Sequence, residues 1–211
     1  MSEFELPLRS DLKGQTPYGA PADPVPVRLN VNENPYPPSE AVVAAISQAV
    51  GAATRGINRY PDRDAVDLRE ALRAYLDFES GVNINCDRIW AANGSNEIMA
   101  QVFSAFGGPG TTALTFDPTY SMYPEYARDS FTEMVSIPRR SDFTIDIDSA
   151  IAAVKEHQPT LVILTSPNNP TGTSIVLADI EAVLIAAEEI GALVVVDEAY
   201  AEFRRERGAT D

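Results

Sequence analysis

The feature that most constrains the fold is a pair of short, unbroken apolar runs rich in Val, Ile and Leu. One run covers residues 160–165 and the other covers residues 192–196. A half-exposed strand alternates apolar and polar residues, whereas a strand covered on both faces reads as a continuous apolar run. The two runs therefore predict buried strands of a parallel sheet that has helices on both faces.

From Ser39 onward, strand-like and helix-like patterns alternate along the chain. Ser39 and Asp64 are expected to cap the first two helices, and a third helix opens at Ser95. Ile98, Met99, Val102 and Phe106 make the predicted buried face of that third helix. Together the patterns predict an α/β fold, a three-layer αβα arrangement with a mostly parallel sheet. The further predicted helices cover residues 119–129, 148–157 and 177–190, and the predicted strands cover residues 88–92, 112–116, 133–137, 160–165 and 192–196.

The first 38 residues differ from the rest because they contain eight prolines. Proline fixes its own φ and biases the preceding residue away from the helix. We therefore expect residues 1–38 to form an extended arm that lies on a surface, and residues 39–211 to belong to one larger domain.

Charge and composition exclude several classes of function. The formal net charge is -15, which repels nucleic acid and anionic membranes. We find no apolar segment typical of a signal peptide and no run long enough to cross a bilayer. Cys86 is the single cysteine, is interpreted as a packed apolar residue and has no metal-ligand spacing around it. These features favour a cytoplasmic protein without a metal site.

Ligands of parallel sheets bind at the carboxyl ends of the strands, and three unusual loops are expected there. The first, residues 92–97, places Gly94, Ser95 and Asn96 at the start of a helix. The N–H groups of a helix N-terminus attract phosphate, so the loop is a candidate phosphate site. Taken alone, this loop is more often a simple turn with a Ser cap.

The other two loops follow the two apolar runs. In the octet of residues 165–172, two prolines and a glycine fix Asn168 and Asn169, although an Asn-rich turn is usually structural. Asp197 ends the second run, where a carboxylate is costly to bury unless it is paired. A protonated pyridine nitrogen would be a suitable partner, and Tyr200 would lie on the same side if the segment turns helical. The alternative is that Asp197 caps the following turn.

Together these loops carry a resemblance to a known family. The octet and the downstream Asp197-Glu-Ala-Tyr200 resemble the fold-type I pyridoxal-phosphate (PLP) aminotransferases. Four other segments, residues 30–38, 59–62, 94–97 and 118–123, are similar to the histidinol-phosphate aminotransferases of actinobacteria. The resemblance covers nearly the whole chain and implies the large, PLP-binding domain of such an enzyme.

The resemblance implies a role for several residues. Asp197 pairs with the pyridine nitrogen, Asn169 and Tyr200 bond the ring hydroxyl oxygen, and Tyr120 stacks on the ring. The cofactor phosphate is held by Gly94, Ser95 and Asn96, and by Tyr60 from the other subunit of a homodimer. The substrate side is lined by Glu33, Asn34 and Tyr36. Tyr123 and Tyr126 are interpreted as core packing.

The implied reaction is transamination of histidinol phosphate with 2-oxoglutarate in histidine biosynthesis. Such enzymes need a lysine that forms a Schiff base with PLP, some thirty residues after the counterpart of Asp197. This chain has only Lys13 and Lys155, neither of which resembles that lysine, and it ends at Asp211. We therefore expect an incomplete large domain, no C-terminal small domain, and no activity for these 211 residues alone.

Two other interpretations remain open at this point. An aromatic amino-acid aminotransferase of the same subgroup would share the three loops and differ in its substrate pocket. A truncated, non-catalytic remnant would explain why no lysine stands at the expected place. A phosphate-binding protein unrelated to PLP is disfavoured, because a plain phosphate site has no use for the carboxylate of Asp197.

Overall fold

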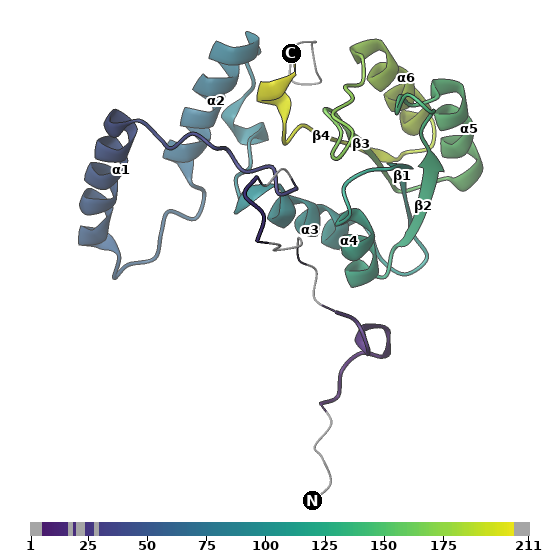
Figure 1. Cartoon of the computed structure of the whole chain (residues 1–211), viewed down its shortest axis with the longest axis horizontal. Helices are drawn as coiled ribbons and strands as arrows, with labels where there is room; N and C mark the ends of the chain where they lie inside the picture. The colour runs from purple at the N-terminus through teal and green to yellow at the C-terminus, as the bar shows by residue number, and fades with distance from the viewer. Residues whose placement is uncertain (1–5, 17–18, 20–23, 28–29, 205–211) are drawn as a thin grey trace, which may run out of the picture. The chain divides into compact units, whose positions relative to one another are not determined.

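The computed structural model describes residues 6–16, 19, 24–27 and 30–204, and the chain divides into two units after Tyr60 (Figure 1). The first unit contains α1 (Glu40–Ala53), which Ser39 caps as predicted by accepting a hydrogen bond from the Val42 N–H. The division falls after Tyr60 and not after Pro38, and the separate role of residues 1–38 as an arm stays a prediction.

The second unit is built on a sheet of four parallel strands. Its strands are β1 (Thr112–Asp117), β2 (Glu133–Pro138), β3 (Leu161–Thr165) and β4 (Leu193–Asp197), in the spatial order β2-β1-β3-β4. Every neighbouring pair is parallel. The prediction of a parallel sheet is therefore confirmed.

Helices cover both faces of this sheet, as Figure 1 shows. Helices α5 (Ile147–His157) and α6 (Leu177–Glu188) pack on one face, and α3 (Gly94–Phe106) and α4 (Tyr123–Ser130) pack on the other. The predicted three-layer αβα arrangement is thus confirmed.

The pleat of the strands divides the core into two halves. Leu114 and Phe116 of β1 face α5 and α6, whereas Ala113 of the same strand faces α3 and α4. Strand β3 has a neighbour on each edge and helices on each face, so all five of its residues are buried. Burying a large apolar side chain completely stabilises the fold by about 1.5–3 kcal/mol, so the apolar run of β3 anchors the unit.

Strand β4 is less buried than predicted. It lies at the edge of the described sheet, and none of its residues is classed as buried. An edge strand has one neighbour instead of two, which leaves its open side less covered.

The strand predicted at residues 88–92 is wrong. Cys86–Arg88 form a 3₁₀ turn (η3), and the residues after it join no strand. The Arg69 guanidinium donates hydrogen bonds to the carbonyl oxygens of Ile89, at 2.8 Å, and of Cys86, at 2.7 Å. An arginine side chain therefore takes carbonyl groups that a neighbouring strand would otherwise bind.

Asp64 does not cap the second helix, whose N-cap residue is Ala65, and the carboxylate that accepts from the first helical N–H is that of Asp62. Helix α2 covers Val66–Ser80, and the Asp62 carboxylate accepts hydrogen bonds from the Val66 N–H, at 2.9 Å, and from the Asp64 N–H, at 3.2 Å. The carboxylate of Asp64 instead pairs with Arg63.

Two further predictions about helices need correction. Helix α4 begins at Tyr123 and not at Thr119, because Pro124 stands in its first turn, where a proline needs no N–H partner. In α3, Met99 and Phe103 are the buried residues, whereas Phe106 is 51% exposed. Ile98 and Val102 are half-buried.

The remaining elements are short 3₁₀ turns at Ser10–Leu12 (η1), Thr54–Gly56 (η2) and Ala201–Phe203 (η4). In the described part of the chain, no helix combines the length and the apolar character that a membrane span requires. Among the same residues, no three His, Cys, Asp or Glu side chains gather as a metal would need.

Candidate functional site

Polar side chains gather at the carboxyl ends of β3 and β4, on the face covered by α3 and α4. Thr165 ends β3 and Asp197 ends β4, and the two residues are paired in the register of the strands. Side chains at paired positions of neighbouring strands lie on the same face of a sheet. The sheet thus sets Thr165 beside Asp197 at the edge where ligands of α/β proteins bind.

The carboxylate of Asp197 is held from two sides. Its Oδ2 accepts a hydrogen bond from the Tyr123 hydroxyl at 2.8 Å, and its Oδ1 accepts one from the Ala199 N–H at 3.1 Å. Asp197 therefore does cap the following turn, as the alternative interpretation held. It also has a second bond that a turn cap does not need.

Tyr123 is a fully buried phenol on α4 that sequence reasoning assigned to core packing alone. Its hydroxyl lies 2.7 Å from Thr165 Oγ1, in addition to its bond to Asp197. Burial and the neighbouring carboxylate raise the pKa of Tyr123 far above its ordinary value. The phenol consequently keeps its proton and stays a donor toward Asp197.

Two adjacent asparagines in the loop after β3 differ in their contacts. Asn168 is buried, and its amide donates to the Pro118 carbonyl at 3.0 Å and to Thr171 Oγ1 at 2.8 Å, while its Oδ1 accepts from the Thr119 hydroxyl. Asn169 is half-buried, and its side chain has no hydrogen bond within the described part of the chain. Asn168 therefore holds the loop together, and Asn169 takes no part in that network.

The N-terminus of α3 is the place where the sequence predicts a phosphate site. Gly94 begins the helix with φ +75°, and a Cβ placed on it would meet no atom within 4 Å. The residue before the helix, Asn93, makes no side-chain cap bond, so the alternative of a Ser95 cap is not observed among the described residues. The Gly94 N–H donates to the Ala92 carbonyl at 2.9 Å. Glu97 instead accepts from the N–H of Asn93 at 2.6 Å, a bond that lowers the pKa of its carboxyl.

Aromatic residues connect this helix start to Asp197. Asn96 Oδ1 accepts hydrogen bonds from the hydroxyls of Tyr120, at 3.2 Å, and Tyr126, at 2.8 Å. The rings of Tyr120 and Tyr123 meet edge to face with centroids 5.6 Å apart. The uncapped helix end and the carboxylate of Asp197 are therefore linked through Asn96, Tyr120 and Tyr123.

The segment after β4 forms a turn and then a 3₁₀ turn, so Tyr200 does not follow Asp197 on an α-helix. Tyr200 is the residue directly before η4 and is half-buried. Two contacts anchor this segment. Glu202 accepts from the Tyr75 hydroxyl at 2.7 Å, which raises the pKa of Tyr75 to about 12, and Glu198 pairs with Arg204.

Four residues predicted for the site lie in the first unit. Tyr60 and Tyr36 are exposed there, Asn34 Oδ1 accepts from the Tyr36 N–H, and Glu33 is also exposed. The two units are not placed relative to one another. The roles assigned to these four residues therefore stay predictions.

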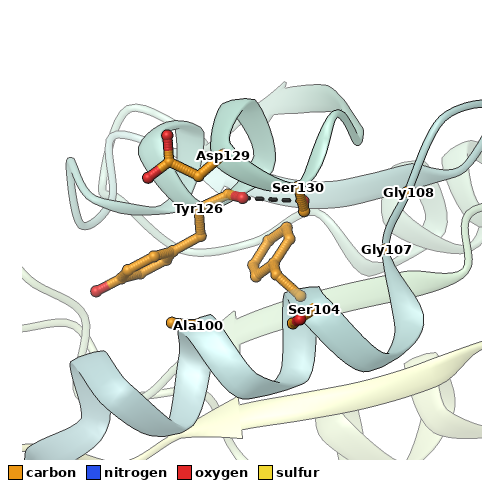
Figure 2. Close-up of a pocket in the computed structure, with 8 residues that line it drawn as sticks. Ala100, Ser104, Gly107, Gly108, Tyr126, Asp129 and Ser130 are labelled. Carbon is orange, nitrogen blue, oxygen red and sulfur yellow. Dashed lines mark hydrogen bonds between the residues drawn. The ribbon is translucent and has the colours of Figure 1, made fainter.

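A cavity of about 390 Å³ lies elsewhere, between the C-terminal halves of α3 and α4 (Figure 2). Ser130 lines it, and its hydroxyl donates to the Tyr126 carbonyl, as the dashed line in Figure 2 marks. Gly107 closes one end, where a Cβ would lie 2.3 Å from Thr132 Oγ1. The Ser130 hydroxyl is thus bonded within α4, and none of the residues predicted for the site lines this cavity.

The contact that sequence reasoning missed is the bond between Tyr123 and Asp197. The available signal was positional, because a buried phenol needs a hydrogen-bond partner and a carboxylate at the end of a buried strand needs a donor. Tyr123 and Asp197 are 74 residues apart in the sequence, so their contact could be recognised only from the register of the sheet, which the structure supplies.

Comparison with known proteins agrees with this geometry. The sequence pattern of the family described as aminotransferase class I and II matches residues 24–210. The histidinol-phosphate aminotransferase of Thermobifida fusca is 58% identical over 202 residues, which are 96% of this chain and 53% of that protein. The histidinol-phosphate aminotransferase of Bifidobacterium adolescentis is 55% identical over 208 residues, covering 94% of this chain and 53% of that protein.

A solved structure has the same fold. The crystal structure of histidinol-phosphate aminotransferase from Sinorhizobium meliloti in complex with pyridoxal-5'-phosphate superposes with a TM-score of 0.70 at 27% identity, covering 82% of this chain and 44% of that one. The chain spans about half the length of the curated relatives that it matches. Because the family pattern extends over most of its residues, the chain belongs to the aminotransferase class I and II family.

Proposed function

We propose that the complete protein is a PLP-dependent aminotransferase that exchanges the amino group of histidinol phosphate with 2-oxoglutarate in histidine biosynthesis. One observation carries the proposal. A carboxylate fixed at the end of β4 and an uncapped helix N-terminus are linked through two tyrosines at one edge of the sheet. The relative from Thermobifida fusca, which bears the name of this activity, supports the choice of substrate.

The donor set of this edge fits PLP chemically. A phosphate group needs N–H donors and open space, and the start of α3 offers both beside Gly94. A protonated pyridine nitrogen needs a fixed carboxylate, which Asp197 supplies. A ligand that is only a phosphate would use the N–H donors at the start of α3 and would make no use of the carboxylate of Asp197.

Each residue of the second unit that was predicted for the site then has a role toward the cofactor. Gly94, Ser95 and Asn96 hold the phosphate, and Asp197 holds the ring nitrogen in its protonated form. Tyr120 lies against the ring face. The ring hydroxyl oxygen accepts hydrogen bonds from two further side chains, Asn169 and Tyr200.

The first unit contributes the remaining roles in a cytoplasmic homodimer. Tyr60 reaches the cofactor phosphate of the other subunit, and Glu33, Asn34 and Tyr36 line the substrate side. The described part of residues 1–38 belongs to an arm that lies on its own body or on the partner subunit, and residues 39–211 belong to the large domain. The family resemblance supports each of these assignments.

Bound PLP supplies an electron-withdrawing ring that stabilises negative charge on the substrate carbon. The residues of this chain serve that chemistry by orientation and charge. Asp197 keeps the proton on the ring nitrogen, and the N–H groups of α3 neutralise the phosphate. The amide of Asn169 would donate to the ring oxygen and so help to orient the cofactor.

The proposal is tested by comparing two amino donors with the complete natural protein. With 2-oxoglutarate as acceptor, kcat/KM for histidinol phosphate should exceed kcat/KM for phenylalanine by about 100-fold or more, because a site built for a phosphate and an imidazole leaves polar groups unpaired with a phenyl ring. Glutamate formation is the measured quantity. A higher kcat/KM for phenylalanine would refute the substrate, and a protein that neither binds PLP nor forms glutamate would refute the function.

A further inference from the structure

Tyr123 has no part in the roles assigned above, yet it donates the shorter of the two hydrogen bonds that hold the carboxylate of Asp197. It lies in the first turn of α4 and is fully buried. Its hydroxyl is 2.8 Å from Asp197 Oδ2 and 2.7 Å from Thr165 Oγ1. A buried phenol that served packing alone would need only one partner for its hydroxyl.

Counting protons fixes the direction of these bonds. An ionised carboxylate only accepts, so the single proton of the Tyr123 hydroxyl is donated to Asp197. The Thr165 hydroxyl must then donate its own proton to the oxygen of Tyr123. Thr165 Oγ1 also lies 3.3 Å from Thr119 Oγ1, but the Thr119 hydroxyl donates to Asn168 Oδ1 at 3.0 Å and so gives no proton to Thr165. The contact of Thr165 with Tyr123, at 2.7 Å, is the shorter one. The result is a directed chain from Thr165 through Tyr123 to Asp197.

Two further facts give this chain of hydrogen bonds a single direction. The opposite oxygen of the carboxylate, Oδ1, accepts from the Ala199 N–H, so both oxygens are fixed by separate elements. Burial and Asp197 raise the pKa of Tyr123, which keeps the phenol protonated throughout the physiological range. The Tyr123 hydroxyl therefore remains a hydrogen-bond donor as the pH changes within this range.

We propose that Tyr123 is a positioning residue, which holds the carboxylate of Asp197 in the one orientation that presents it to the ring nitrogen of the cofactor. This inference rests on the proposed function. Tyr123 acts through Asp197 and touches no reacting atom itself. Thr165 in turn orients Tyr123, so the end of β3 is connected to the cofactor through the end of β4.

The test compares two probes that differ in the one atom that Asp197 recognises. The dissociation constants of the complete natural protein are measured for pyridoxal 5'-phosphate and for its 1-deaza analogue, in which a C–H group replaces the ring nitrogen. The wild type should bind PLP more tightly than the analogue. In Tyr123→Phe, we expect this preference to fall about tenfold, since a hydrogen bond to a charged group is lost. A merely structural defect would weaken the binding of both probes equally.

Matched variants isolate the effect. Tyr126→Phe removes a phenol hydroxyl from the same helix, but that hydroxyl bonds Asn96, so the preference should stay at the wild-type value. In an Asp197→Asn background, Tyr123→Phe should change the preference no further, because the two residues act on one interaction. If Tyr123→Phe does not fold, Thr165→Val replaces it as the test and should lower the preference less strongly.

An unchanged preference for PLP in the variant that folds overturns the positioning role. Failure of the proposed function has a different result. In that case the wild type itself would bind PLP no better than the 1-deaza analogue, or would bind neither probe.

Discussion

Asp197 shows how a single residue can have two roles in one structure. A carboxylate at the end of an apolar strand loses much of its hydration, and this cost is offset by the two hydrogen bonds from Tyr123 and Ala199. Only one of those bonds belongs to a turn. The other comes from a different element, and it orients the carboxylate toward the edge where we place the cofactor.

Replacing Asp197 by Asn should therefore affect catalysis more than cofactor retention. Asn cannot keep a proton on the ring nitrogen, whereas the N–H groups of α3 still hold the phosphate. We expect kcat of the complete protein to fall by about 10²–10³-fold or more while PLP stays bound, as measured by glutamate formation and by absorbance of the bound cofactor. Asp148→Asn, which alters an exposed carboxylate in the first turn of α5, is the control and should leave kcat unchanged. Full activity in Asp197→Asn would refute the role of the carboxylate.

At the residue scale, the sequence indicated which side chains matter but not what they contact. Asp197 and the octet after β3 were identifiable because charged and amide groups directly after apolar runs are unusual. Tyr123 was not identifiable, because an aromatic residue inside the helix predicted over residues 119–129 is interpreted as core packing. Its second role depends on Thr165 and Asp197, which become its neighbours only through the sheet.

Among the elements, the loop after β3 contains two neighbouring asparagines, of which Asn168 stabilises the fold and Asn169 is proposed to bind the cofactor. Asn168→Ala should lower the free energy of unfolding of the complete protein by about 1–3 kcal/mol, because the Pro118 carbonyl and the Thr119 hydroxyl lose a buried partner. Asn169→Ala is the matched change and should leave that free energy nearly unchanged while weakening the binding of PLP. Denaturant unfolding and cofactor titration measure the two quantities. The reverse pattern would show that the roles of the two asparagines are exchanged.

The start of α2 allows a pH-dependent test. Asp62 accepts backbone hydrogen bonds from Val66 and Asp64, and these bonds lower the pKa of its carboxyl. A carboxyl whose pKa is lower in the folded state contributes stability above its unfolded pKa and loses it as pH falls through the folded value. Asp62→Ala should therefore speed amide hydrogen exchange in the first turn of α2 at pH 7, and the difference from wild type should shrink below a pH of about 4.

Asp64→Ala provides the control for this helix start. The side chain of Asp64 pairs with Arg63 and caps nothing, so its removal should leave amide exchange in α2 at the wild-type rate. Faster exchange in Asp64→Ala than in Asp62→Ala would mean that the original prediction of Asp64 as the cap was correct.

Element boundaries were predictable where local chemistry decides them. Ser39 marks the start of α1 correctly, and the unbroken run before Thr165 marks β3. Residues 88–92 have the composition of a strand, but Arg69 binds the Ile89 carbonyl there and the Cys86 carbonyl just before them. Such a long-range side-chain contact leaves no periodic signal in the sequence. Pro124 did carry a local signal for the start of α4, which the helical spacing of the apolar residues obscured.

For the whole molecule, the fold class followed from the sequence because the alternation of apolar runs and amphipathic helices has few other solutions. The arrangement of the two units did not, since neither pattern nor composition determines how residues 1–60 meet the sheet. The role proposed for Tyr60 belongs to this scale, because it requires a second copy of the chain.

Mixed dimers test that role directly. If Tyr60 serves the site of the other subunit, a dimer of one Tyr60→Phe chain and one Asp197→Asn chain contains one unaltered site. Random mixing of the two variants should then restore wild-type PLP affinity and activity at about one quarter of the sites. Each variant alone should restore none. Mixtures that behave as the average of the two variants would place Tyr60 in the site of its own subunit.

The most direct test of the central claim is the crystal structure of the complete natural protein with PLP. Our account predicts that the ring nitrogen lies within hydrogen-bonding distance of the Asp197 carboxylate, with Tyr123 still bonded to the same carboxylate. It also predicts the phosphate at the N–H groups of Ser95 and Asn96. A cofactor bound elsewhere, or a phosphate held away from the start of α3, would contradict the account.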